Sequence, residues 1–259
     1  MHKIEEKLKA FERLLEIMDE LREKCPWDKE QTLDSLRNLT IEETYELADA
    51  IMDQDLTEIR KELGDLLLHI VFYAKIGSEK GAFDIADVLN GINEKLVFRH
   101  PHVFGNVKAE TEGEVAKNWE ELKLKEGKKS VLEGVPKSLP AMVKASRIQD
   151  KAASSGFDWD NSNQVLDKVK EEIEELHDEV KRADQLKMEA EFGDVLFSMI
   201  NYARFINVDP ESALERTNKK FIKRFQYLEK EVKKEGKKLH DLSLEQMDVH
   251  WENSKTFFK

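Results

Sequence analysis

A pattern of acidic residues occurs twice along this chain of 259 residues, with the same spacing in both copies. The first copy consists of Glu42, Glu43, Glu46, Glu62 and Asp65, and the second of Glu171, Glu172, Glu175, Glu191 and Asp194. The copies lie 129 residues apart, and in each of them 15 residues separate the third acid from the fourth. Residues three apart share a helix face, so two antiparallel helices would bring four carboxylates together. The repeat therefore predicts a tandem fold with one acidic site in each copy.

Converging carboxylates repel one another unless protons or a cation neutralise them. Because the ligands all offer hard oxygen atoms, Mg2+ or Mn2+ is favoured over zinc. A single acidic helix face is more often merely solvated, since charged residues make up 37% of this chain. Two copies with identical spacing argue against that interpretation. We expect Mg2+, with Mn2+ as a substitute, at Glu43, Glu46, Glu62 and Asp65 and at their counterparts in the second copy.

A glycine precedes the last acid of each copy, at Gly64 and Gly193. Glycine inside a helix costs about 1 kcal/mol relative to alanine. Its presence in both copies predicts a close backbone approach or tight helix packing at this point.

Length and charge narrow the class of protein. The chain is long enough for two compact domains. Its net charge of −12 disfavours direct nucleic-acid binding, which would need a basic face. Cys25 is the only cysteine, which excludes an intramolecular disulfide and fits a reducing cytosol. The strongest apolar run, residues 66–74, is too short to span a bilayer. We expect a cytoplasmic protein that does not insert into membranes.

Scarce glycine and proline, at 11 and 5 residues, and a helical periodicity throughout predict an all-α fold. We expect two tandem helical-bundle repeats, at 1–126 and 141–259, joined by a linker at 127–140. A capping box of Thr40 and Glu43 predicts the start of the helix that carries the first acids. The other predicted helices are 3–24, 55–76, 84–99, a short one around Trp119, 142–154, 162–183, 185–206 and 209–235.

The repeat continues beyond the acids. Residues 93–99 match 218–224, and Trp119 with Glu120 matches Trp251 with Glu252. An isolated repeat is too small to hide both of its apolar faces, so we expect packing between repeats or between chains. Of the two, we favour a homodimer that completes the bundles.

Carboxylates, cations and a tryptophan together favour a Mg2+-dependent phosphate ester or anhydride site for a nucleotide. Mg2+ keeps positions open for phosphates, and arginine and lysine pair with phosphate oxygens. Two metals per site are compatible with this pattern. The chain has no P-loop sequence. Lys220 and Arg224 could instead cap a helix end, and Trp251 could be a hydrophobic anchor; both alternatives stay open here.

Further motifs give the chain a resemblance to a known family. They are Cys25-Pro26-Trp27-Asp28 with Gln31-Thr32, the two acidic elements, the segment 99–104 (RHPHVF) and Gly156-Phe157-Asp158-Trp159. With these motifs the sequence resembles MazG, the tandem-repeat nucleoside triphosphate pyrophosphohydrolases of the all-α NTP pyrophosphatase group. The resemblance implies hydrolysis of ribo- or deoxynucleoside triphosphates to monophosphate and pyrophosphate, dependence on Mg2+ and a dimeric helical assembly.

The resemblance also implies roles for residues of the second repeat. It implies Mg2+ binding and catalysis by Glu172, Glu175, Glu191 and Asp194, with Glu171 beside them. It implies nucleotide contacts by Lys168, Glu171, Lys187, Lys220, Lys223, Arg224 and Trp251. The first repeat has Leu39 where the second has Lys168, and Glu94 and Phe98 where the second has Lys219 and Lys223. We therefore expect the second repeat to be the main catalytic site.

Three alternatives remain. A carboxylate-bridged di-metal helical protein of the ferritin type needs a Glu-x-x-His on two helices. Glu174 and His177 supply one such pair, but the first repeat has Ala48 at the histidine position. A non-catalytic helical scaffold or regulatory protein would also have acidic helix faces. A dUTPase-like or dCTPase-like relative would differ only in base and sugar preference, which the sequence leaves open.

Overall fold

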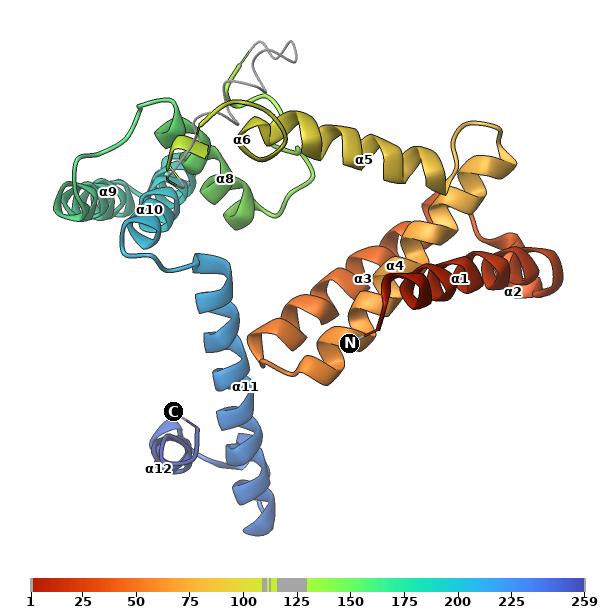
Figure 1. The fold of residues 1–259 in the computed structure, drawn as a ribbon. Coiled ribbons are helices and arrows are strands. Elements are labelled where there is room, and N and C mark those ends of the chain that lie inside the picture. The colour runs from red at the N-terminus through yellow and green to blue at the C-terminus, as the bar shows by residue number, and fades with distance from the viewer. Residues whose placement is uncertain (1, 109–110, 112, 116–129, 259) are drawn as a thin grey trace. The chain divides into compact units, whose positions relative to one another are not determined.

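The computed structural model describes residues 2–108, 111, 113–115 and 130–258, and within these residues the regular elements are helices (Figure 1). The predicted all-α class is confirmed. The chain divides into two compact units, Met1–Glu110 and Thr111–Lys259, called here the first and second unit. The boundaries expected from the sequence, with repeats at 1–126 and 141–259 and a linker between them, remain a prediction. The expected helix around Trp119 and the linker residues 127–129 lie outside the described residues.

The first unit is built around an antiparallel helix hairpin. Its helices are α1 (Ile4–Lys24), α2 (Pro26–Glu30), α3 (Leu33–Met52), α4 (Leu56–Glu79), α5 (Ile85–Arg99) and α6 (Pro101–Phe104). The side chain of Asp55 accepts hydrogen bonds from the Thr57 and Glu58 amides and so begins α4. Asp84 caps α5 in the same way. Both helix starts agree with the sequence prediction.

The predicted start of α3 at Thr40 is wrong. The helix begins at Leu33, where Thr32 and Ser35 form the capping box instead. Thr40 lies inside the helix, and its hydroxyl donates to the carbonyl oxygen of Leu36 at 2.9 Å. A Thr-x-x-Glu sequence also occurs inside helices, where the threonine hydroxyl can donate to the carbonyl oxygen four residues earlier.

The core of the first unit lies where α1 and α3 meet α4. Met18, Leu36, Val71, Phe72 and Ile76 form one buried cluster. Phe72 is only 1% exposed, and truncating such a side chain to alanine costs about 3–5 kcal/mol. Arg22 of α1 holds the C-terminal end of α2 by donating to the carbonyl oxygens of Asp28, Lys29 and Gln31.

The second unit repeats the hairpin and adds a further helical pair. Its helices are α8 (Ala141–Ser154), α9 (Ser162–Arg182), α10 (Gln185–Phe205), α11 (Pro210–Lys234), a short 3-10 helix (Leu239–Asp241) and α12 (Leu244–Ser254). α9 and α10 form the antiparallel hairpin, α8 packs on α10, and α12 packs on α11 (Figure 1). Arg204 of α10 pairs with Asp158 and so fixes the loop before α9.

The two glycines that occupy matching positions of the repeat, Gly64 and Gly193, do not make the predicted close approach. A methyl group added at Gly64 or Gly193 would meet no atom within 4 Å in the described structure. The expected close backbone approach is therefore not made within either unit. Beside these glycines, matched apolar side chains are exposed in both hairpins: Leu63, Leu67 and Ile70 on α4, and Phe192, Leu196 and Met199 on α10.

None of the helices in the described ranges has both the length and the apolar character that a bilayer crossing requires.

Candidate active site

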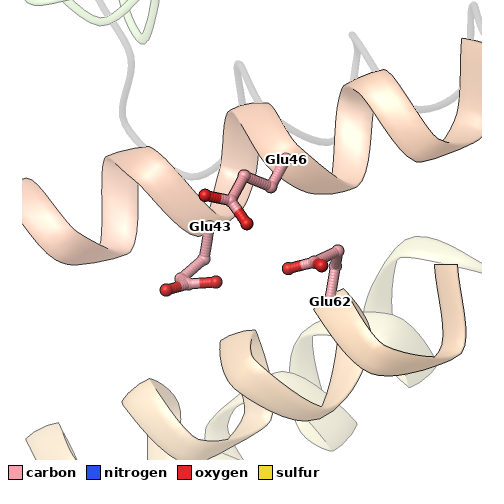
Figure 2. A group of neighbouring side chains, drawn as sticks. All are labelled: Glu43, Glu46 and Glu62. Atoms are coloured by element: carbon pink, nitrogen blue, oxygen red, sulfur yellow. The ribbon is translucent and has the colours of Figure 1, made fainter. Parts of the chain in front are cut away.

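In the first unit, three glutamates converge between the two helices of the hairpin. Glu43 and Glu46 project from α3 toward Glu62 of α4 (Figure 2). One carboxylate oxygen from each lies within 4.8 Å of the others. Glu62 is only 3% exposed, and its Oε2 is buried with no hydrogen-bond partner. A buried, unpartnered carboxylate oxygen beside two further carboxylates fits a cation ligand set.

The second unit contains the same arrangement. Glu172 and Glu175 of α9 and Glu191 of α10 also offer oxygen atoms within 4.8 Å of one another, and Glu172 is buried. Asp65 and Asp194 lie outside these two triplets, one helical turn after Glu62 and Glu191. Asp65 is close enough to Glu43 to affect its ionisation. Glu171 is exposed at the edge of the second triplet.

The electrostatics of both clusters show unbalanced negative charge. Partial burial, followed by repulsion from Asp65, Glu46 and Glu62, raises the pKa of Glu43. Desolvation, followed by repulsion from Glu172 and Glu191, raises the pKa of Glu175. A divalent cation would remove this repulsion and hold the carboxylates in their charged form.

One lysine partly neutralises each cluster, but the two lysines come from different helices. In the second unit, Lys168 of α9 lies 2.8 Å from Glu172 and 2.9 Å from Glu171. In the first unit, Lys61 of α4 lies 2.9 Å from Glu62. The neighbouring carboxylates raise the pKa of both lysines. Lys168 was among the predicted site residues. Lys61 was not, although it directly precedes Glu62; its counterpart in the second repeat is Ala190.

The remaining predicted nucleotide residues are not joined to the acids by a hydrogen bond or ion pair within the described ranges. Lys187 lies 3.8 Å from Asp184. Lys220, Lys223 and Arg224 lie on α11. Arg224 donates to the carbonyl oxygen of Phe258 at 2.9 Å, and its guanidinium lies 6.0 Å from the ring centre of Trp251.

Trp251 also packs on Phe221, with the ring centres 5.0 Å apart. Arg224 and Trp251 thus hold α12 against α11, the packing role that the sequence left open beside nucleotide binding.

A polar network that the sequence analysis did not identify lies next to the first cluster. Thr40 Oγ1 lies 2.7 Å from both His69 Nδ1 and Tyr73 Oη. Burial lowers the pKa of His69, which favours a neutral ring. The second unit has Val169 and Ser198 in place of Thr40 and His69, so the repeat gave no signal for this network. No histidine belongs to either described carboxylate triplet, which disfavours the ferritin-type alternative.

Two helical hairpins in tandem, each with three converging glutamates, define a class of all-α proteins with a repeated acidic cluster. The sequence model described as "MazG nucleotide pyrophosphohydrolase domain" matches residues 31–104 and 161–228. The chain belongs to the MazG family, as its motifs indicated.

Relatives of this chain align over almost its whole length. A protein of Escherichia coli (strain K12) named "Nucleoside triphosphate pyrophosphohydrolase" is 43% identical over 257 residues, which is 96% of this chain and 98% of that protein. A Thermotoga maritima protein named "Nucleoside triphosphate pyrophosphohydrolase/pyrophosphatase MazG" is 45% identical over 250 residues, or 95% of each chain. The Bacillus subtilis protein YabN is 47% identical over 97% of this chain, which corresponds to 53% of YabN.

Proposed function

We propose that this chain is a Mg2+-dependent nucleoside triphosphate pyrophosphohydrolase, which converts an NTP or dNTP and water to the monophosphate and pyrophosphate. Family membership and the names of the full-length relatives support the reaction. The observation that carries the metal dependence is the pair of glutamate triplets, each with a buried member. Mn2+ has the same preference for oxygen ligands and is the expected substitute.

In the second unit, Glu172, Glu175, Glu191 and Asp194 would hold the metal, which supplies positive charge to the phosphate oxygens. Glu171, at the edge of the cluster, would accept the proton of the attacking water. The water oxygen forms a bond to the α-phosphorus, and the bond from that phosphorus to the bridging oxygen breaks. Pyrophosphate leaves with the electron pair of that bond. Lys168 and Lys187 would pair with the phosphate chain.

We further propose that the second unit is the main catalytic site. Asp53 and Glu58 of the first unit correspond to Arg182 and Lys187 of the second. The cleft beside the first cluster, about 290 Å3, is lined almost wholly by acids, with Lys61 as its cation. The negative charge of this cleft attracts a metal cation but repels a triphosphate. In the second unit, Lys168 and Lys187 supply positive charge that attracts the phosphates of the substrate.

Lys220, Lys223, Arg224 and Trp251 remain proposed nucleotide contacts. Arg224 and Trp251 hold α12 on α11 in this structure. For these residues to contact the nucleotide, α11 and α12 would have to approach the acids when substrate binds. Alanine variants at Lys220 and Lys223, whose side chains are not part of that packing, test it through KM. An unchanged KM in both variants contradicts the contact.

A homodimer is proposed from the exposed apolar side chains that both hairpins present at matched positions. A second copy would cover them and complete the bundles. Light scattering during size-exclusion chromatography tests this assembly. A cytoplasmic location, consistent with the single cysteine, completes the proposal.

The experiment that tests the reaction is product analysis with the eight common NTPs and dNTPs, in Mg2+ and in EDTA. We expect monophosphate and pyrophosphate, and no turnover in EDTA. Diphosphate with orthophosphate would contradict the proposed reaction. Glu172→Gln and Glu43→Gln form a matched pair for the asymmetry: we expect roughly a 100-fold or greater loss of kcat/KM in the first and a small loss in the second. Equal losses would contradict the assignment to the second unit.

A further inference from the structure

The first unit contains a buried histidine that the proposed reaction does not use. His69 of α4 is only 7% exposed. Its Nδ1 lies 2.7 Å from Thr40 Oγ1, and Tyr73 Oη lies 2.7 Å from the same oxygen. The second unit has Val169 and Ser198 in place of Thr40 and His69. The two acidic clusters therefore differ in the side chains that lie next to their carboxylates.

The hydrogen bonds around Thr40 fix which ring nitrogen of His69 carries the proton. A threonine hydroxyl has one hydrogen, and that of Thr40 goes to the carbonyl oxygen of Leu36 at 2.9 Å. The Thr40 oxygen therefore accepts hydrogen bonds from His69 and Tyr73, so the proton of the imidazole is on Nδ1. The Nε2 atom keeps its lone pair. A histidine whose other ring nitrogen donates to a fixed acceptor is typical of metal-binding sites.

The charge state of the ring also suits a metal ligand. Burial lowers the pKa of His69, and the charge of Asp65 opposes this shift only in part. A neutral imidazole is the form that binds a metal ion. Because the charge of Asp65 acts on the ring, the carboxylate and the imidazole are also neighbours.

The geometry of the hairpin places His69 beside the first cluster. The residue follows Asp65 by four positions on α4, and helical side chains lean toward the N-terminus of their helix, so the ring lies over the turn of Asp65. Thr40 precedes Glu43 by three positions on α3. The contact between Thr40 and His69 is therefore one helical turn from Glu43 and Asp65.

The first cluster also contains a buried oxygen that a cation would stabilise. Glu62 is 3% exposed and points toward Glu43 and Glu46 (Figure 2). Lys61 donates to its Oε1 at 2.9 Å, whereas its Oε2 is buried and has no hydrogen-bond partner in the described structure. A buried charged oxygen is costly unless it is paired or coordinates a metal.

A nitrogen ligand changes which metal such a site prefers. Mg2+ prefers oxygen ligands, whereas imidazole binds first-row transition metals more readily. The triplet of the second unit consists of glutamates, and Ser198 stands where the first unit has His69. The carboxylates of the second unit therefore suit Mg2+, and the first unit adds a ligand that Mg2+ does not favour.

We propose that the first unit binds a divalent transition-metal ion and that His69 Nε2 is its nitrogen ligand beside the carboxylates of the first cluster. The inference rests on the proposed metal dependence, because the same carboxylates take part. It goes beyond that proposal by giving the two units different metals: Mg2+ for the reaction in the second unit, and a transition metal in the first.

The test uses Mn2+ as the probe, because its unpaired electrons couple to a nitrogen that binds it directly. Glu172→Gln removes a ligand of the second cluster, so Mn2+ bound to this parent variant reports on the first cluster. Electron spin echo envelope modulation of the bound ion should show coupling to an imidazole nitrogen. Adding His69→Ser, which copies Ser198 of the second unit, should remove the coupling. Adding His2→Ser, at an exposed histidine of the first unit, is the matched control and should keep it.

Calorimetry in the same parent variant measures the selectivity between metals. His69→Ser should weaken Mn2+ binding about tenfold or more and Mg2+ binding by no more than about threefold. Thr40→Val, which copies Val169 and removes the acceptor of the Nδ1 proton, should weaken Mn2+ binding about tenfold while the nitrogen coupling remains. Equal losses for the two metals in His69→Ser would mean that the histidine only supports the packing, and would overturn the proposal.

Mn2+ bound to the parent variant without nitrogen coupling overturns the assignment of His69 and leaves the pyrophosphohydrolase reaction standing. This spectrum decides the question even where His69→Ser does not fold. Failure of the parent variant to bind Mn2+ also overturns the proposal. Absence of hydrolysis by the wild-type protein contradicts the proposed function instead, and the spectrum still decides on the metal ligand.

Discussion

Lys168 Nζ lies 2.8 Å from a carboxylate oxygen of Glu172, one helical turn further along α9. Glu172 is buried, whereas the lysine is about one-third exposed, so the ammonium reaches into the acidic cluster from its edge. This contact reduces the repulsion among three glutamates. It also places a cation where the phosphate chain of a substrate would approach.

Replacing Lys168 with alanine should lower kcat/KM by roughly 10- to 100-fold, since a hydrogen bond between charged groups is lost. The free energy of unfolding in EDTA should fall by no more than about 1 kcal/mol, because the lysine is partly exposed. Steady-state kinetics and urea denaturation measure the two effects. Lys170→Ala, which breaks an exposed pair with Asp167, is the control. Equal kinetics for the two variants would count against a role for Lys168 at the phosphates.

Glu62→Gln should make the first unit more stable without metal but less responsive to Mg2+. The substitution gives up the ion pair with Lys61, which is weak because the lysine is exposed. It also removes the buried charge of Glu62, whose Oε2 has no partner, and the new amide can donate to a neighbouring glutamate. We expect a gain of about 1 kcal/mol in EDTA and a smaller rise in Tm on adding Mg2+. Thermal denaturation in EDTA and in Mg2+ measures both. Glu12→Gln, at an exposed position on α1, should leave the Mg2+ response close to wild type. A full Mg2+ response in Glu62→Gln would exclude this residue as a ligand.

The ion pair of Asp158 with Arg204 should make the second unit sensitive to acid. Hydrogen bonding to Arg204 lowers the pKa of Asp158. The stabilisation is therefore present above the unfolded-state pKa of about 3.9 and is lost as the pH falls through the lower folded-state value. Asp158→Asn should cost about 1 kcal/mol at neutral pH and almost nothing near about pH 2. Urea denaturation at the two pH values measures this difference, with the exposed Asp167→Asn as control. A pH-independent cost would point to a steric effect instead.

Gly64→Ala and Gly193→Ala should each stabilise the protein by up to about 1 kcal/mol, because alanine favours the helix and its methyl group meets no neighbour. Urea denaturation and light scattering on the same samples provide the measurement. If the variants instead lose stability and a dimer dissociates, the prediction is wrong. That result would mean that the backbone of a second chain packs against these glycines.

Much of the fold could be predicted because its signals are local. Asp55 and Asp84 mark helix starts by capping, and the repeated spacing of the acids predicted the hairpin that brings them together. Thr40 was misread because a Thr-x-x-Glu sequence is compatible with both a helix start and a helix interior. Its contacts with His69 and Tyr73 depend on a helix that lies 29 to 33 residues away in sequence.

Other features depend on packing that a single sequence does not reveal. Gly64 and Gly193 predicted a close approach, yet a methyl group added at either position would meet no atom within 4 Å in the described structure. Lys61 and Lys168 neutralise corresponding clusters from different helices, so aligning the two repeats could not pair them. Phe72 and Asn201 occupy corresponding positions of the repeat, but only the folded structure shows that one packs in a core and the other borders a cavity between α8 and α10.

The different surroundings of Phe72 and Asn201 also predict how often the two helices open locally. Phe72 is surrounded by core side chains, whereas Asn201 borders a hollow, so local opening of α10 near this residue breaks fewer apolar contacts. Amide hydrogens between Phe197 and Arg204 should exchange with solvent faster than those between Leu68 and Lys75 in α4. Of the two corresponding hairpins, the one beside the cavity should therefore open locally more often.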